Sequence, residues 1–210
     1  MDVVFLLFDK VTVLDAVGPY EVLHRVPGAN VKFVAQEPGP KSDERGGLKL
    51  VADHSFDEEE SADVLVVPGG LGTRPLIKDD ATLQWIRAID DATQWTTSVC
   101  TGALLLAAAG LLNHRPAATH WLSYELLRSL GAEPTEQRVV FSDKYVTAAG
   151  VSSGIDMALA LVQHTHGDEL AQTIQLAIEY DPQPPVDAGS PSKAPAEIVE
   201  RLRERARARD

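Results

Sequence analysis

The sequence predicts an α/β fold with a mainly parallel central sheet and helices on both of its faces. Two observations support this class. Short apolar runs recur along the chain and end at turn residues, as buried parallel strands do. Segments suited to helices separate these runs, and strands that alternate with helices are typical of a parallel sheet covered on both sides.

The expected strands are short and rich in β-branched and other apolar residues. In chain order they lie at 3–8, 31–35, 48–51, 64–67, 96–99, 139–141 and 145–148. The third is the weakest and is assigned to a hairpin after Gly46-Gly47. The last two bracket Ser142-Asp143-Lys144, which suit a hairpin turn.

The expected helices lie, in chain order, at 17–24, 79–91, 103–112, from about 119, 155–164 and 169–178. The first is expected after the break at Gly18-Pro19. The second is amphipathic, with three inward positions: Leu83, Ile86 and either Ala88 or Ile89.

Composition limits the class of protein. The chain has 210 residues, is 44% hydrophobic and carries a formal net charge of −12. This acidic balance argues against a nucleic-acid binder and predicts no attraction to an anionic membrane. No run of about 18 apolar residues suggests a membrane span, and the start of the chain lacks the basic segment of a signal peptide. The single cysteine cannot form an internal disulfide or a zinc–thiolate cluster, so we expect a reducing, cytoplasmic setting.

The end of the chain differs from the rest. Residues 181–196 contain five prolines, which predict an extended arm. The Glu/Arg-rich stretch that follows predicts a solvated terminal helix, whose arginines are balanced by acids. We therefore divide the chain into an α/β domain at 1–185 and a proline-rich linker with a charged helix or tail at 186–210.

Cys100 is the strongest candidate for a catalytic residue. It lies between the expected strand at 96–99 and the Ala/Leu-rich helix that follows. A helix N-terminus favours the thiolate, which predicts a pKa below the usual value of about 8.5. The alternative is a buried core cysteine that acts as a small hydrophobic residue.

Asp15 is the candidate proton carrier for that nucleophile. It follows the first strand, in an apolar context that would raise the pKa of its carboxyl group. The alternative is a helix N-cap, a position that Asp favours.

Four further residues are assigned supporting roles. Thr101 could bind a substrate heteroatom through its hydroxyl or simply cap the helix. The Gly69-Gly70 turn lets backbone N–H groups approach a ligand, which makes the N–H groups of Gly70 and Leu71 oxyanion-type donors, although glycines also merely form turns. His120 could approach the cleft or be structural. The other histidines lack ligand spacing, so we expect no metal and no phosphate loop.

Several motifs together resemble the ThiJ/PfpI superfamily, over about residues 1–185. They are the stretches 14–23 (LDAVGPYEVL), 67–70 (VPGG), 98–103 (SVCTGA), 118–121 (ATHW) and 149–156 (AGVSSGID). Asp15 with Cys100-Thr101, and the segment EYDPQPP at 179–185, are most similar to the isocyanide hydratase family. The resemblance implies a flavodoxin-like sandwich of the class I glutamine amidotransferase type.

The resemblance also implies a lyase that hydrates a small-molecule isocyanide to an N-substituted formamide, without a cofactor and as a homodimer. The family's nucleophile, acid and threonine fall on Cys100, Asp15 and Thr101. Thr101 replaces the histidine of protease-like members, and the chain stops before the helix-turn-helix region of related regulators. Two alternatives stay open: a redox or stress-response protein that acts through oxidation of Cys100, and a non-catalytic ligand sensor.

Overall fold

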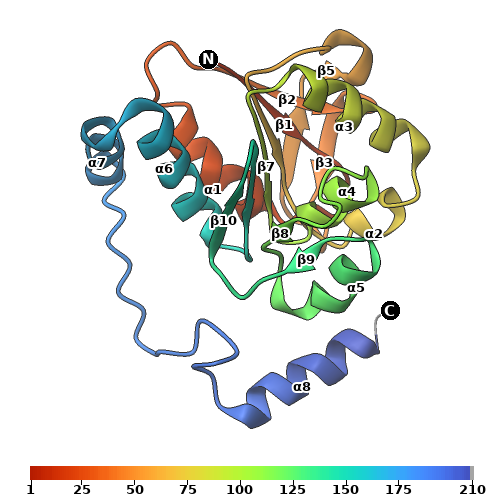
Figure 1. Cartoon of the computed structure of the whole chain (residues 1–210), viewed down its shortest axis with the longest axis vertical. Coiled ribbons are helices and arrows are strands. Elements are labelled where there is room, and N and C mark those ends of the chain that lie inside the picture. The colour runs from red at the N-terminus through yellow and green to blue at the C-terminus, as the bar shows by residue number, and fades with distance from the viewer. Residues whose placement is uncertain (209–210) are drawn as a thin grey trace. The chain divides into compact units, whose positions relative to one another are not determined.

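A seven-stranded sheet forms the centre of the protein in a computed structural model that describes residues 1–208 (Figure 1). Its strand order is β10-β11-β7-β6-β1-β2-β5. Every neighbouring pair is parallel except the antiparallel hairpin of β10 and β11. The strands are β1 (Asp2–Leu6), β2 (Asn30–Ala35), β5 (His54–Ser55), β6 (Val64–Val67), β7 (Trp95–Val99), β10 (Val139–Ser142) and β11 (Tyr145–Ala148). This confirms the predicted α/β class.

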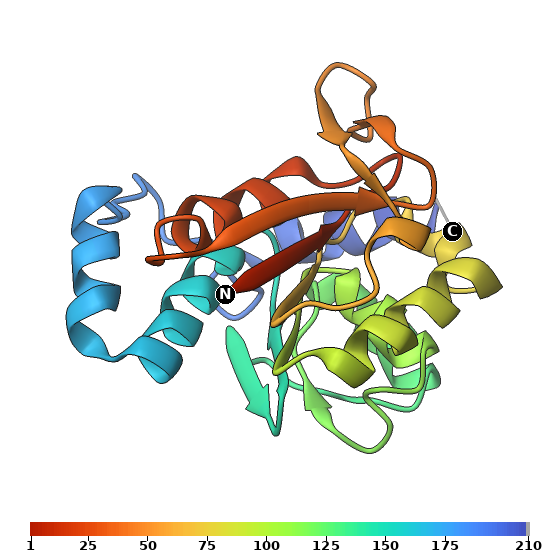
Figure 2. The ribbon, with the colours of Figure 1, turned by 90° about the horizontal axis from the view of Figure 1, so that it is seen from above.

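Helices cover both faces of the sheet, as Figure 1 shows. One face carries α1 (Val13–Leu23) and α6 (Ser153–His166), with α7 (Asp168–Ala177) packed beside α6 (Figures 1 and 2). The other face carries the helices α2 (Thr73–Leu76), α3 (Asp80–Ala92), α4 (Gly102–Ala108) and α5 (Tyr124–Ser129).

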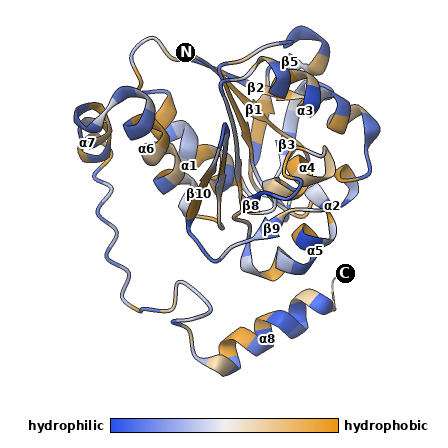
Figure 3. Cartoon of the chain, viewed as in Figure 1, coloured by the Kyte–Doolittle hydropathy of each residue, from blue (hydrophilic) through white to orange (hydrophobic). Residues whose placement is uncertain are grey.

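The sheet separates two hydrophobic cores because successive side chains of a strand point to opposite faces. Strand β1 shows this directly. Val3 and Phe5 pack with the α1 and α6 side, whereas Val4 and Leu6 pack with the α3 and α4 side. The strands of the sheet are accordingly largely hydrophobic in Figure 3.

Two small sheets and two single turns of 3₁₀ helix complete the first part of the chain. A hairpin of β3 (Gly39–Ser42) and β4 (Lys49–Ala52) projects from the main sheet (Figure 2). Short strands β8 (Pro116–Ala117) and β9 (Glu133–Pro134) pair in parallel. The 3₁₀ turns lie at Phe56–Glu58 and Trp121–Ser123.

The first helix begins earlier than the sequence predicts. Helix α1 starts at Val13, so the Gly18-Pro19 pair lies inside it and does not precede it. The pair is accommodated by close packing of α1 against α6. A Cβ atom on Gly18 would lie 3.1 Å from Ile155 Cγ1, and one on Gly154 would lie 3.1 Å from the ring of Pro19.

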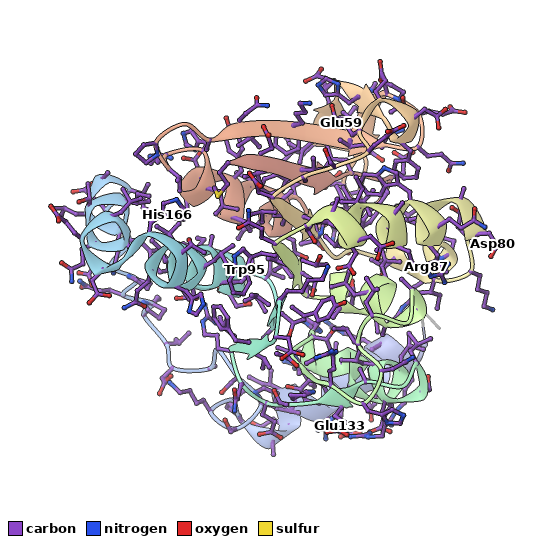
Figure 4. The ribbon with its side chains drawn as sticks, turned by 45° about the horizontal axis from the view of Figure 1, so that its top comes forward. Glu59, Asp80, Arg87, Trp95, Glu133 and His166 are labelled. Atoms are coloured by element: carbon purple, nitrogen blue, oxygen red, sulfur yellow. The ribbon has the colours of Figure 1, made fainter. Side chains whose placement is uncertain are left out.

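Helix α3 buries one apolar stripe, as predicted. Leu83, Ile86 and Ile89 are buried, and Ala88 is exposed, which decides the alternative left open by the sequence. The labelled Arg87 of this helix donates a hydrogen bond to the carbonyl oxygen of Ala109, just after α4 (Figure 4). The helix expected from about residue 119 is instead the 3₁₀ turn followed by α5.

The described chain forms two units, Met1–Ile178 and a second that begins at Glu179. The second unit contains the extended proline-rich segment and the charged helix α8 (Ala196–Arg207). Our division at residue 185 stays a prediction. None of the helices within residues 1–208 is long and apolar enough to cross a membrane.

The order of the strands in the sheet indicates where a ligand site should lie. β1 is flanked by β2 on one side and β6 on the other, so the chain changes direction across the sheet at β1. In open parallel sheets, ligands bind beyond the carboxyl ends of the strands at such a switch point. Asp15 lies in the first turn of α1, just after the loop that follows β1, and the turns that follow β6 and β7 carry Gly69 and Cys100.

Candidate active site

Cys100 occupies the sharp turn between β7 and α4. Its φ angle is 58°, in the left-handed region that a cysteine rarely adopts. Three hydrogen bonds to the Cys100 backbone hold this conformation. The Cys100 N–H donates to the carbonyl oxygens of Ala149 at 2.6 Å and Ala148 at 3.1 Å, and the Cys100 carbonyl accepts from Thr119 Oγ1 at 2.8 Å. Backbone held in such a conformation by its surroundings is common at catalytic sites.

Asp15 lies in the first turn of α1, with its side chain fully buried. The helix N-cap is Thr12, so the alternative reading of Asp15 as the cap is wrong. The N–H of Gly69 donates to Asp15 Oδ2 at 3.0 Å. The second carboxyl oxygen, Oδ1, is buried and has no hydrogen-bond partner among the described residues. An unsatisfied oxygen in a buried site is costly and therefore calls for a functional explanation.

The environment of Asp15 makes its carboxyl group a weak acid. Burial raises its pKa to about 7, and the Gly69 N–H and the Cys100 thiol offset part of that rise. A carboxyl group with this pKa exchanges protons readily near neutral pH.

The structure corrects the prediction of a low thiol pKa. Burial raises the pKa of Cys100 well above its usual range, and the charge of Asp15 raises it further, against smaller lowering effects of the Thr101 backbone and hydroxyl. Cys100 is only 5% exposed, so loss of solvation outweighs the dipole of the short helix α4. At neutral pH the cysteine is therefore a thiol beside a carboxyl group that can accept its proton.

This arrangement predicts the pH dependence of alkylation. Reaction of Cys100 with iodoacetamide should have a midpoint well above that of an ordinary cysteine, because burial and the charge of Asp15 raise the pKa of its thiol. Asp15→Asn should shift that midpoint to lower pH, because the substitution removes the nearby negative charge that disfavours the thiolate. Following alkylation by mass spectrometry across pH, for both proteins, measures the two midpoints. A midpoint below 8.5 in the unmutated protein, or no shift in the variant, would contradict this account.

Thr101 contacts the glycine loop after β6. Gly70 N–H donates to Thr101 Oγ1 at 2.8 Å, and the same hydroxyl donates to the Gly70 carbonyl at 3.2 Å. Thr101 occupies the N-cap position of α4 but makes no side-chain capping bond, so its hydroxyl does not serve as a helix cap. Because Thr101 occupies the Gly70 N–H in this arrangement, the oxyanion role of Gly70 and Leu71 stays a prediction.

Gly69 allows Thr101 and Asp15 to approach each other closely. A Cβ atom at this position would lie 2.5 Å from Thr101 N, 2.7 Å from Thr101 Oγ1 and 2.8 Å from Asp15 Oδ2. No side chain fits between these groups. The glycine therefore has a steric role in the site besides its role in the turn.

Gly69→Ala should consequently lower activity by about 100-fold or more while the α/β fold persists, because catalytic geometry tolerates displacements of only about 1 Å. Gly47→Ala is the matched control, since Gly47 has open space around it and an ordinary backbone conformation. Activity and far-UV circular dichroism of both variants test this. Equal activities would show that Gly69 does not set the site geometry.

His120 forms a further wall of the site. A Cβ atom on Gly150 would lie 2.6 Å from His120 Cδ2 and 3.4 Å from Cys100 Sγ, so Gly150 lies between the imidazole and the thiol. Burial, helped by the charge of Arg74, lowers the pKa of His120, which keeps the ring neutral. Its Nδ1 accepts from the Leu122 N–H at 3.4 Å, which leaves the ring proton on Nε2.

The structure thus brings Cys100, Asp15, Thr101 and Gly70 together and places His120 beside them. Sequence reasoning did not assign roles to Thr119, which holds the backbone of Cys100, or to Gly150, which lies close to the thiol. Only their presence in the motifs at 149–156 and 118–121 marked them. Among residues 1–208, no group of three or more His, Cys, Asp or Glu side chains could hold a metal ion.

A strained cysteine at a strand–helix turn, paired with a buried carboxyl group in an α/β sandwich, defines the class of protein. The model of the DJ-1/PfpI family matches residues 1–164, and the chain belongs to that family. It is 44% identical to the isonitrile hydratase of Pseudomonas putida over 202 residues, which cover 96% of this chain and 88% of that protein.

Two other proteins are similar to most of this chain. A ThiJ/PfpI family protein from Pseudomonas syringae has a crystal structure that matches with a TM-score of 0.93 and 36% identity, over 97% of this chain and 84% of that one. The HTH-type transcriptional regulator GbdR of Pseudomonas aeruginosa is 26% identical over 84% of this chain, but only 50% of the regulator is covered.

Proposed function

We propose that this protein hydrates an isocyanide, also called an isonitrile, to an N-substituted formamide through a covalent thioimidate on Cys100. The observation that carries the proposal is the buried pair of Cys100 and Asp15, in which the thiol lies beside a carboxyl group with a pKa near 7. The isonitrile hydratase relative supports the choice of substrate class. An isocyanide is also a neutral molecule with a terminal carbon, which suits a nucleophile that is 5% exposed.

The first half of the reaction forms the thioimidate. Asp15 carboxylate accepts the proton of the Cys100 thiol as the sulfur attacks the terminal carbon of R–N≡C. The new C–S bond leaves an electron pair on that carbon. Asp15 returns the proton to this carbon, which gives R–N=CH–S–Cys100. Asp15 is ionised again at the end of this half, so one group acts as base and then as acid.

The second half consumes water. Asp15 carboxylate accepts a proton from water as the water oxygen adds to the thioimidate carbon, and it passes that proton to the nitrogen to give R–NH–CH(OH)–S–Cys100. Collapse of this intermediate breaks the C–S bond and forms the formamide carbonyl. The hydroxyl proton returns to the Cys100–Asp15 pair. The two halves together convert one isocyanide and one water to one formamide, without a cofactor.

The supporting residues hold these groups in place. The Thr101 hydroxyl is fixed by Gly70 and lies close enough to Cys100 to lower the pKa of its thiol, so it would orient the substrate or the water beside the sulfur. Neutral His120, with its proton on Nε2, would donate to the substrate nitrogen. The Gly70 N–H would stabilise developing negative charge through the Thr101 hydroxyl that it holds, and the Leu71 N–H would do so directly.

Direct assay tests the proposal. The purified protein is incubated with cyclohexyl isocyanide and an aryl isocyanide, and the formamides are quantified by chromatography. Turnover above the buffer rate is expected for at least one substrate. Absence of turnover across several isocyanides would overturn the proposal and favour the redox or sensor alternatives. The raised pKa of the Cys100 thiol argues against the redox alternative, because oxidation proceeds through the thiolate.

We also propose that the protein acts as a homodimer in the cytoplasm, without nucleic acid as a partner. A reducing compartment keeps Cys100 as a thiol, and a net charge of −12 disfavours contact with phosphate backbones. Light scattering after size-exclusion chromatography should give about twice the chain mass of 22.7 kDa. A monomer mass at micromolar concentration would contradict the dimer.

A further inference from the structure

A cavity lies beside the candidate active site. It has a volume of about 380 Å³ and lies at the carboxyl ends of β1 and β2, beside the β3–β4 hairpin and α2. Of the candidate site residues only Leu71 lines it, whereas Cys100, Asp15, Thr101, Gly70 and His120 do not. The volume falls within the range of small-molecule binding sites.

The interior of this cavity is apolar. It is lined by the side chains of Leu6, Phe8, Ala35, Phe56 and Leu76. Leu71 also lines it and is 41% exposed, so this apolar side chain would lose contact with water if a ligand filled the space. An apolar ligand body would therefore be favoured here.

Two lysines give the cavity a positive charge. Lys10 and Lys41 are its lining cations, and neither forms a salt bridge with any residue in 1–208. The one lining acid, Asp9, is already engaged: its Oδ1 accepts from both the N–H and the hydroxyl of Ser42 at 3.0 Å. The hydrogen bonds from Ser42, together with the charge of Lys41, lower the pKa of Asp9, so the lining carries two cations against one carboxylate.

We propose that this cavity binds a small organic anion with an apolar body, of the carboxylate class. The apolar lining would take the body, and Lys10 and Lys41 would take the carboxylate. Charge-assisted hydrogen bonds to a carboxylate are among the stronger polar contacts in proteins. The polar side chains of Gln36 and Thr82 add hydrogen-bonding capacity to the lining.

The cavity and the active site lie on either side of the loop that follows β6, and Leu71 of that loop belongs to both. The carbonyl oxygen of Lys10 accepts from the Gly72 N–H at 3.2 Å, and Thr12 N–H donates to the Gly69 carbonyl at 2.8 Å. The loop that follows β6 therefore forms a wall of the cavity through Leu71 and Gly72, and holds Asp15 through Gly69. Binding in the cavity does not use the Cys100 thiol, so the inference is independent of the proposed hydratase activity.

Calorimetric titration of the full chain with three eight-carbon probes tests the inference. Octanoate should bind, 1-octanol should bind at least about tenfold more weakly, and octylammonium should not bind. The Lys10→Gln/Lys41→Gln double variant should lose about tenfold in octanoate affinity and keep its weak affinity for octanol. Lys78→Gln, a lysine outside the cavity lining, is the matched control and should bind octanoate normally.

Two more variants separate the cavity from the active site. Leu76→Trp should fill the cavity and abolish binding of octanoate, whereas Cys100→Ser should leave that binding unchanged. The inference is overturned if octanoate does not bind, if all three probes bind equally, or if Cys100→Ser removes binding. Because the readout is affinity and not turnover, a failed hydratase assay would leave this result intact.

Discussion

Cys100→Ser should abolish isocyanide hydration, with a loss on the order of 10⁴-fold or more in kcat/KM, the scale seen when a covalent nucleophile is removed. The reason is acidity. Asp15 has a pKa of about 7 and can accept a proton from a thiol, but it is far too weak a base for a serine hydroxyl. The fold should persist, because serine has nearly the size of cysteine and meets the same backbone strain at φ 58°.

Intact-mass spectrometry sharpens this test. Protein quenched during turnover should carry an adduct of the full mass of the isocyanide, because formation of the thioimidate adds the whole molecule and loses nothing. The Cys100→Ser variant should carry none, with an unchanged thermal unfolding midpoint. Turnover by the serine variant would rule out covalent catalysis by Cys100.

The sequence predicts which residues meet in the site better than it predicts the pKa of the Cys100 thiol. Val64–Val67 is a strand with the expected bounds, and parallel strands bring the loops after β1, β6 and β7 to one edge. The meeting of Asp15, Gly69 and Cys100 follows from that topology alone. The pKa of Cys100 does not, because it depends on how deeply tertiary packing buries the thiol and on which charge lies next to it.

The misplaced start of α1 has a similar cause. The Gly18-Pro19 pair is a strong local signal for a helix break, yet helix packing overrides it. Gly18 and Gly154 allow α1 and α6 to approach closely, and this contact stabilises a helix that contains Pro19. Once the helix begins at Val13, Asp15 lies in its first turn and points into the protein. Because the sequence places the start of this helix too late, it allows Asp15 to be interpreted as the helix N-cap. The structure excludes that interpretation.

Asp15→Asn should lower the rate of hydration by about 10²–10⁴-fold, the range for loss of a general acid–base group. Asn keeps the shape of the side chain and can still accept the Gly69 hydrogen bond, but it cannot carry a proton between sulfur and carbon. In the unmutated protein kcat/KM should rise with pH to a plateau with an apparent pKa near 7, since protonated Asp15 cannot accept the thiol proton. The variant should lack this rise.

The same substitution should change stability in the opposite sense. The pKa of Asp15 is raised from 3.8 to about 7 by folding, so the native state binds the proton more tightly than the unfolded chain. Its favourable contribution is complete below about pH 4 and is lost as pH rises through 7. Asn is neutral throughout, so the variant should gain on the order of 2–3 kcal/mol relative to the unmutated protein between pH 5 and pH 8.

Urea unfolding of both proteins at pH 5 and pH 8 measures this difference, with Asp53→Asn, an exposed carboxyl group, as the control that should show no comparable change. If Asp15 is a buried carboxyl group that carries protons, the Asp15→Asn variant should be slower than the unmutated protein. The variant should also become more stable relative to the unmutated protein as pH rises. A residue with only a structural role would lose stability with the substitution at both pH values and retain most of its rate. Near-normal hydration by Asp15→Asn would transfer the proton-donor role to Thr101 or to bound water.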